Sequence, residues 1–407
     1  MEYRNIETLG AAPSLLGYGC MRFPTLDDAS IDEPQARRLL DRAIEGGVNY
    51  FDTAYFYHKG ASENFMSRAL AQYPRGSYYL TSKLPTVLVH DLDEARRIFD
   101  EQWERLDRTY LDFYLLHNLN GERWRLLRDQ GVVDWCLDLQ RQGLFRRFGF
   151  SFHGSYDEFE EILTAREWDL CQLQLNYMDT KEQAGLRGYA LTEKRGVPLV
   201  IMEPVKGGAL ANPPAEAMEL FQRARPGASA ASWALRWAAS LPNVMTVLSG
   251  MSTLEQVEDN LATFNAFRPL DEGERAVVEQ AAAVYRRRVR NGCTGCRYCM
   301  PCPAGVDIPR NFTLWNEYGI YGNEKQTASR WRDLEEERKG KNCLSCGRCE
   351  AACPQHLSIR EDLKRLQTEL DGLLCVRDTD RAPGHSRPGA LRVRGPGPGA
   401  RRPVPAG

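Results

Sequence analysis

The chain has 407 residues, with 53 basic and 55 acidic side chains and a formal net charge of −2. This balance gives no support to a protein that binds polyanions by neutralising phosphates, and no apolar run approaches the ~20 residues that cross a bilayer. The first residues lack the basic-then-apolar pattern of a secretory signal, so we expect a soluble protein of the cytoplasm. The length suits two or three domains.

Short β-rich runs recur up to residue 270, with segments of helical periodicity between them. The runs cover residues 16–20, 48–54, 78–84, 111–117, 145–151, 170–176, 198–204 and 244–250. Parallel strands need such helical crossovers, and eight βα units predict an α/β fold, a (β/α)8 TIM barrel in residues 1–270. A doubly wound sheet is the alternative, but no GxGxxG sequence follows the first strand to support it.

Polar side chains stand where consecutive predicted strands end. Asp52, Lys83, His117 and Ser151 each lie at such an end, and Tyr57 follows Asp52 on the next loop. Charged side chains are costly to bury without partners, and the active sites of these barrels lie at the carboxyl ends of the strands. We therefore predict the chemistry at this end of the barrel.

Seven stretches of residues 1–270 resemble the aldo-keto reductase family. They are LGYGCMRFP, FDTAYFYHKGASE, YYLTSKLP, LDFYLLHN, GFSFHG, CQLQLNYMD and SGMSTLEQVEDNL. The resemblance implies a catalytic tetrad of Asp52, Tyr57, Lys83 and His117. In this tetrad Tyr57 is the proton donor, and the ammonium of Lys83 is expected to lower its pKa, which is about 10 in free tyrosine. Asp52 holds Lys83, while His117 orients the carbonyl oxygen and can relay the proton.

The same resemblance implies a nicotinamide cofactor, NADP(H) or NAD(H). Ser151 and Gln172 match the residues that hold the nicotinamide carboxamide, but Phe152 replaces the Asn common in the family, and we expect one contact to be missing. Met202 stands where many members stack an aromatic ring on the nicotinamide.

The phosphate and adenosine ends of the cofactor involve further predicted contacts. They are Lys206 and Gly208 along the pyrophosphate, and Gly250, Gln256 and Asn260 at the adenosine. An ordinary glycine-rich turn explains Lys206 and Gly208 equally well. Members that prefer NADPH usually place Lys or Arg where Gly250 and Gln256 stand. We predict NADP(H) from the usual preference of the family, although these two residues do not favour it.

The cysteines mark a second domain after a linker helix over residues 271–291. Residues 292–372 hold two sets, namely Cys293, Cys296, Cys299 and Cys302, then Cys343, Cys346, Cys349 and Cys353. The second set resembles the C-x2-C-x2-C-x3-C-P run of bacterial ferredoxins. We predict a small α-helical, ferredoxin-like domain with two 4Fe-4S clusters; a pair of zinc sites is the alternative.

The ferredoxin pattern assigns the fourth cysteine of each set to the other set's cluster. One cluster then takes Cys293, Cys296, Cys299 and Cys353, and the other takes Cys343, Cys346, Cys349 and Cys302. The first set has two residues rather than three before Cys302, so the role of Cys302 is the least secure of the eight. Residues 373–407 are rich in Arg, Pro and Gly, and we expect them to be disordered.

The leading hypothesis is therefore an NAD(P)H-dependent oxidoreductase of the iron–sulfur subgroup of aldo-keto reductases. It would act on a small-molecule carbonyl or alcohol, with a redox protein as a further partner and with no nucleic acid or membrane. The alternative is an iron–sulfur electron-transfer protein whose barrel serves as a docking scaffold. The pocket-shaping loops transfer least between relatives, so the sequence does not specify the substrate.

Overall fold

The computed structural model describes residues 1–107, 110–293 and 295–379. The chain divides into two compact units, which are Met1–Arg290 with Asn316–Asn323, and Asn291–Trp315 with the residues from Glu324 onward. Each unit is described by itself. No helix in the described ranges is both long and apolar enough to span a membrane.

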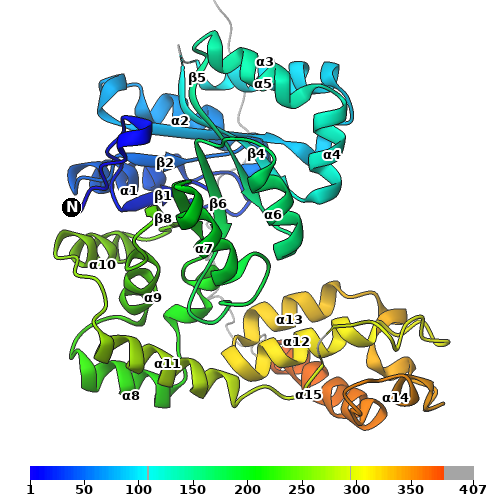
Figure 1. Ribbon diagram of the computed structural model, residues 1–407. Coiled ribbons are helices and arrows are strands. Elements are labelled where there is room, and N and C mark those ends of the chain that lie inside the picture. The colour runs from blue at the N-terminus through cyan, green and yellow to red at the C-terminus, as the bar shows by residue number, and fades with distance from the viewer. Residues whose placement is uncertain (108–109, 294, 380–407) are drawn as a thin grey trace, which may run out of the picture. The chain divides into compact units, whose positions relative to one another are not determined.

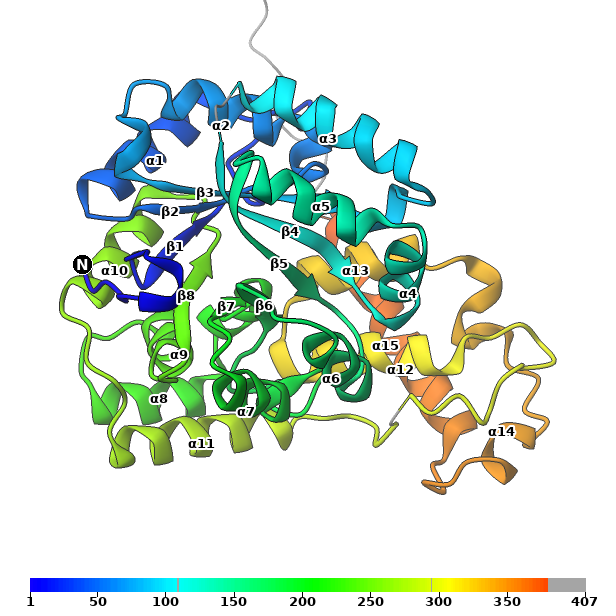
Figure 2. The ribbon, with the colours of Figure 1, turned by 45° about the horizontal axis from the view of Figure 1, so that its top comes forward.

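The first unit is a closed barrel of parallel strands in which each strand pairs with its neighbour in sequence and β1 pairs with β8. The strands are β1 (Leu16–Gly19), β2 (Tyr50–Asp52), β3 (Tyr79–Pro85), β4 (Leu111–Leu119), β5 (Phe145–Phe152), β6 (Leu170–Gln174), β7 (Leu199–Met202) and β8 (Val244–Ser249). Helices surround the strands on the outside (Figures 1 and 2). The predicted (β/α)8 fold is confirmed, and the doubly wound alternative is excluded.

Helices lie between successive strands, with two of them after β4 and two after β7. They are α1 (Glu33–Glu45), α2 (Ser62–Leu70), α3 (Leu92–Leu106), α4 (Gly121–Asp129), α5 (Val132–Arg141), α6 (Tyr156–Thr164), α7 (Gly185–Arg195), α8 (Ala215–Ala224), α9 (Ala230–Ala239) and α10 (Leu254–Asn265). Several begin at a side chain that accepts a hydrogen bond from the first turn, such as Asp91 before α3 and Thr253 before α10. These caps satisfy amide groups that would otherwise lack partners.

Apolar side chains fill the inside of the barrel, so the strands are buried on both faces. Tyr50, Phe113, Leu115 and Val200 form part of this interior. At the amino-terminal end of the strands, the short helix η1 (Glu7–Leu9) contributes Leu9 to the same cluster. The interior is therefore a packed core, and the opposite end of the strands is left to carry polar groups.

The predicted linker contains α11 (Glu272–Arg286), which begins with a capping box between Asp271 and Glu274. Its apolar face, which includes Val278 and Tyr285, joins a cluster with residues of α8 and α9. This helix is thus packed on the barrel unit rather than standing free between domains.

The second unit is helical. It contains the start of α12 (Ile308–Tyr321), then α13 (Glu324–Asp333), α14 (Arg348–Ala351) and α15 (Ile359–Thr379). The indole N–H groups of two buried tryptophans, Trp315 and Trp331, donate to Glu369 and Asp371 of α15 at 2.6 and 2.8 Å. Because α15 runs to Thr379, residues 373–379 are helical, contrary to the expected disordered tail. The rest of that tail, residues 380–407, lies outside the described residues.

Candidate active site

Four of the predicted site residues come from three neighbouring strands and the loop after β2. Asp52 is the last residue of β2, Lys83 lies in β3, and His117 lies in β4, where it pairs in register with Pro85. Tyr57 begins the short helix η2 (Tyr57–Gly60). Their order in the barrel brings all four side chains to the carboxyl end of the strands.

The Lys83 ammonium is the centre of this group. Its Nζ donates to Asp52 Oδ1 at 2.6 Å and to the Thr53 carbonyl at 2.8 Å, and lies 3.3 Å from the Tyr57 hydroxyl. The side chains of Lys83 and Asp52 are only 1% and 2% exposed. A buried pair with this geometry keeps the ammonium charged and points it at the phenol.

Burial and charge act in opposite directions on these groups. Burial raises the pKa of Tyr57 above its usual value, and the neighbouring Lys83 lowers it by less. For Lys83, burial lowers the pKa, but Asp52 and Tyr57 together raise it above the usual value. Lys83 therefore lowers the pKa of Tyr57, as expected from the sequence. The expectation that this pKa would lie below its usual value is wrong, because burial raises it by more. The phenol is protonated at neutral pH.

His117 lies edge-on to Tyr57, with ring centroids 6.0 Å apart. Burial first, and then the nearby charges of Lys83 and His153, lower the pKa of His117 to about 3. The imidazole is thus neutral near pH 7 and has no additional proton to give. This favours orientation of a substrate oxygen by a ring N–H over a proton relay.

A buried network lies behind Lys83. The Glu63 carboxylate, which is fully buried, accepts hydrogen bonds from Ser82 at 2.6 Å and from Gln102 at 2.5 Å. Gln102 also donates to the Lys83 carbonyl at 3.1 Å, and Arg105 contacts Glu63 at 3.3 Å. Together these contacts hold the backbone of β3 where Lys83 leaves it.

Ser151 and Gln172 are register partners on β5 and β6, and both are buried. Ser151 Oγ accepts a hydrogen bond from the Asn118 amide at 2.9 Å. Gln172 Oε1 is buried without a partner, which leaves an acceptor for an amide N–H. Phe152 packs against Phe159 in the core, with ring centroids 5.3 Å apart. Ser151 and Gln172 fit a carboxamide, whereas Phe152 offers it no polar contact.

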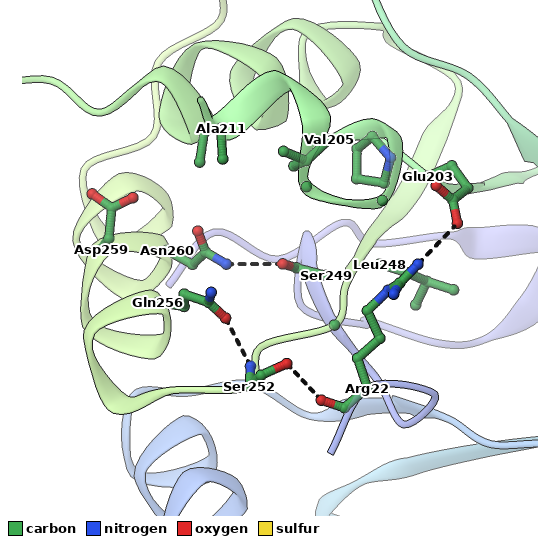
Figure 3. Close-up of a pocket in the computed structure, with 15 residues that line it drawn as sticks. Arg22, Glu203, Val205, Ala211, Leu248, Ser249, Ser252, Gln256, Asp259 and Asn260 are labelled. Atoms are coloured by element: carbon green, nitrogen blue, oxygen red, sulfur yellow. Dashed lines mark hydrogen bonds and ion pairs between the residues drawn. The ribbon is translucent and has the colours of Figure 1, made fainter. Parts of the chain in front are cut away.

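A cavity of about 340 Å³ opens beside the ends of β7 and β8 (Figure 3). Four of the predicted cofactor residues line it, namely Gly208, Gly250, Gln256 and Asn260. Gln256 accepts from the Ser252 amide at 2.8 Å, and Asn260 donates to Ser249 at 2.9 Å. These two side chains therefore also fix the loop after β8 that forms one wall.

Lys206 does not line this cavity. Its ammonium donates to Asp179 Oδ2 at 2.5 Å, and Asp179 also accepts from Asn176 at 3.0 Å. The contact of Lys206 with the pyrophosphate that the sequence predicted would therefore have to compete with the ion pair between Lys206 and Asp179. Gly207 and Gly208, with φ of 62° and 95°, form the turn beside the cavity instead.

The eight cysteines of the second unit line two cavities. Cys293, Cys296, Cys299 and Cys353 lie around one, and Cys302, Cys343, Cys346 and Cys349 lie around the other, with Cys299 touching both. Within the described ranges, no three His, Cys, Asp or Glu side chains converge tightly enough for a single metal ion. Each set of four thiols therefore surrounds one hollow, as the ligands of a cubane would.

The two cysteine sets repeat one backbone design. The amide two residues after the first cysteine donates to its sulfur in both, from Gly295 to Cys293 and from Ser345 to Cys343, each at 3.4 Å. Left-handed residues occur at the same three positions of each set, with φ between 52° and 78°. They are Gly295, Arg297 and Gly305, and then Ser345, Gly347 and His356. The two loops therefore share these positions, whereas among their described residues only the second contains a helix, α14, and only the first contains a cis peptide bond, Met300–Pro301.

Comparison with known proteins agrees with this geometry. The model of the aldo/keto reductase family matches residues 15–283, about two thirds of the chain. The chain belongs to the aldo/keto reductase family. A second family model, a 4Fe-4S dicluster domain, matches residues 292–357. The protein is thus an oxidoreductase of the aldo-keto reductase type that carries a C-terminal iron–sulfur domain.

Individual relatives each align with about two thirds of the chain. The oxidoreductase YqkF of Bacillus subtilis is 24% identical over 307 residues, which cover 68% of this chain and 95% of YqkF. Aldo-keto reductase AKR11C1 from Bacillus halodurans, in its holo form, superposes with a TM-score of 0.59 at 24% identity, over 69% of this chain and 96% of that one. An aldo/keto reductase from Klebsiella pneumoniae in complex with NADP and acetate gives 0.57 at 20% identity, over 69% and 94%. At this identity the two structures show the fold.

The structure adds one residue to this reductase site that the sequence analysis missed. Arg22, on the loop after β1, is the one cation among the described residues that line the cavity. Its guanidinium lies 3.9 Å from Glu203, and its backbone carbonyl accepts from Ser252 at 2.7 Å (Figure 3). The available signal was its place in LGYGCMRFP, one of the stretches that carry the family resemblance.

Proposed function

We propose that this chain interconverts a carbonyl and an alcohol by hydride transfer with a nicotinamide dinucleotide, and that Tyr57 is the general acid and base. The observation that carries the proposal is the position of the Lys83 ammonium, between Asp52 at 2.6 Å and the Tyr57 hydroxyl at 3.3 Å. A carbonyl that accepts a hydride on carbon needs a proton on oxygen, and this phenol is protonated and beside a cation.

Each residue of the tetrad has a separate role in the reduction. Tyr57 donates its proton to the developing alkoxide, and Lys83 stabilises the phenolate that this leaves. Asp52 keeps Lys83 in place, and neutral His117 donates a hydrogen bond to the carbonyl oxygen. The dinucleotide, when bound, supplies the hydride in reduction and accepts it in alcohol oxidation. In oxidation Tyr57 takes the proton back, as microscopic reversibility requires.

For the cofactor we propose NADP(H), held at both ends of the cleft. The free acceptor of Gln172, with Ser151 beside it in register, supports binding of the carboxamide. Arg22 supplies a positive charge for a phosphate, which Gly250 and Gln256 cannot supply. The Klebsiella pneumoniae relative with bound NADP supports the same choice.

For residues 292–372 we propose two 4Fe-4S clusters, with the crossed ligand sets given by the ferredoxin pattern. Each set of four cysteines around one cavity matches one of those ligand sets. The amide-to-sulfur hydrogen bonds to Cys293 and Cys343 would stabilise thiolates, because an N–H donor favours the charged form of its acceptor. When bound, each cluster supplies a one-electron redox centre.

Anaerobic titration of the reconstituted full chain tests the function. NADPH and NADH are added in turn, and nicotinamide fluorescence is followed separately from cluster absorbance, before turnover is measured with a panel of aldehydes and ketones. We expect dinucleotide binding, and we expect Tyr57→Phe to lower kcat by about 10²–10⁴-fold with that binding retained. Clusters that reduce readily in a chain that binds no dinucleotide would instead favour an electron-transfer protein with the barrel as scaffold.

A further inference from the structure

The residue directly after Tyr57 has a strained backbone. His58, Lys59 and Gly60 have successive φ values of 52°, 56° and 91°, all in the left-handed region. Only glycine adopts this region without a steric cost, and a run of three such residues is unusual. Strain of this kind persists where surrounding contacts hold it, and such places are often functional. The backbone conformation at position 58 favours glycine, so contacts of the His58 side chain must offset the steric cost.

The contacts of the His58 ring explain what holds it. His58 Nε2 accepts a hydrogen bond from the Phe23 amide at 3.2 Å, and the ring stacks on Phe23 with centroids 5.7 Å apart. Burial lowers the pKa of His58, while hydrogen bonding to the Cys20 carbonyl raises it by less. The imidazole is thus neutral near pH 7, as an acceptor for the Phe23 amide must be. His58 contacts residues on both sides of Arg22.

The loop that His58 contacts, residues 20–23, forms part of the dinucleotide cavity. Its Arg22 lines the cavity, and on the far side the Ser252 hydroxyl donates to the Arg22 carbonyl at 2.7 Å. A Cβ on Gly250 would lie 3.2 Å from the Arg22 side chain, so the loop also packs closely against the end of β8. Residues 20–23 are therefore held between the loop after β8, which forms one wall of the cavity, and the loop that carries Tyr57.

We propose that His58 is a positioning residue that couples occupancy of the dinucleotide cavity to the placement of the Tyr57 hydroxyl. The coupling runs from Arg22 through the Phe23 amide to the His58 ring, and from there along one peptide bond to Tyr57. A dinucleotide that fixes Arg22 thereby also fixes the backbone on which the acid is mounted. This inference rests on the proposed function, because it assumes that Tyr57 is the acid and that the cavity takes the dinucleotide.

The neighbouring residue provides a matched control. Lys59 has nearly the same left-handed backbone, is exposed, and within the described part of the chain forms no hydrogen bond or ion pair with residues 20–23. Lys59→Gly therefore relieves the same kind of strain without removing the ring. We expect Lys59→Gly to raise the midpoint of thermal unfolding and to leave kcat and both KM values unchanged.

His58→Gly relieves strain but removes the acceptor and the stacked ring. We expect kcat to fall about tenfold and the dinucleotide Kd to rise about fivefold, as the loss of one hydrogen bond allows, without a drop in the unfolding midpoint below that of the wild type. His58→Asn tolerates the left-handed backbone and keeps an acceptor, so we expect it to recover part of the loss. A role in folding alone would move the midpoint and leave the kinetic constants of the folded protein unchanged.

The deciding measurement is a double-mutant cycle between His58→Gly and Arg22→Gln, with the dinucleotide Kd and kcat as readouts. Coupling predicts that the double variant loses less than the product of the two single losses. Independent effects, or a His58→Gly protein with the kinetics of Lys59→Gly, would overturn the inference. A wild-type chain that binds dinucleotide but turns over no carbonyl would refute the proposed function instead, and additive Kd changes in that chain would still refute the coupling.

Discussion

Removal of the Lys83 charge should destabilise the barrel as well as stop the reaction. In Lys83→Met the side-chain volume is nearly kept, but Asp52 loses the partner at 2.6 Å in a place where its own side chain is 2% exposed. Breaking a buried pair by removing one member typically costs about 3–5 kcal/mol of unfolding free energy. We expect a loss of that size at pH 7.

The pH dependence of this loss follows from Asp52. Burial already raises the pKa of Asp52 in the folded protein, and Lys83 is the first group that opposes the rise. Without Lys83 the folded pKa rises further above the unfolded value near 4, so the folded state holds a proton that the unfolded state has released. The part of the unfolding free energy that depends on this proton is then present in full below about pH 4. It is lost as the pH rises through the pKa of Asp52 in the folded protein. Lys83→Met should therefore be closest to the wild type in acid.

Urea denaturation of the full chain, followed by far-UV circular dichroism at pH 5 and pH 7, measures both effects. The matched control is Asp52→Asn with Lys83→Met, which removes both charges and should recover most of the lost stability. A Lys83→Met protein as stable as the wild type at pH 7, or a double variant less stable than the single one, would contradict the reasoning.

Three further predictions use the same protein. Arg22→Gln should raise the Kd for NADPH by about tenfold or more in fluorescence titration, as the loss of a charge-assisted contact allows; an unchanged Kd would remove Arg22 from the phosphate site. Glu63→Ala should leave the buried Ser82 hydroxyl without its acceptor and lower the unfolding free energy by about 1–3 kcal/mol, whereas Glu63→Gln should keep more of it; equal losses would contradict the hydrogen-bond account. Cys353→Ser and Cys302→Ser should each reduce the anaerobically measured iron content and cluster absorbance, and a Cys302→Ser protein with a full complement would exclude Cys302 as a ligand.

Much of the fold was predictable because local patterns determine it. Each strand is an apolar run with a helical crossover after it, and a parallel barrel needs little more. The polar residues at strand ends were visible for the same reason, since Asp52 and Lys83 are the charged residues of strands that are otherwise uncharged. Asp52 and Lys83 lie close together because β2 and β3 are neighbouring strands of the barrel.

The remaining features depend on closure of the barrel and on burial. Arg22 reaches the cavity only because β1 pairs with β8, which brings residues about 230 positions apart into contact. The turn of Lys206 toward Asp179 depends on two loops whose geometry the sequence does not specify. The net rise in the pKa of Tyr57 comes from burial, whereas the sequence showed only the neighbouring cation.

The doubled cysteine loops have a consequence for how the metal domain matures. With the crossed ligand sets proposed above, each cysteine loop would contribute three sulfurs to its own cluster and one to the other cluster, so neither cluster could be completed until both loops are in place. Oxidative loss of one cluster would leave the loop that supplies the fourth ligand of the other cluster without its own metal anchor. The two metal groups should therefore be gained and lost as an interlocked pair, and a preparation with half the iron should be a mixture of full and empty chains.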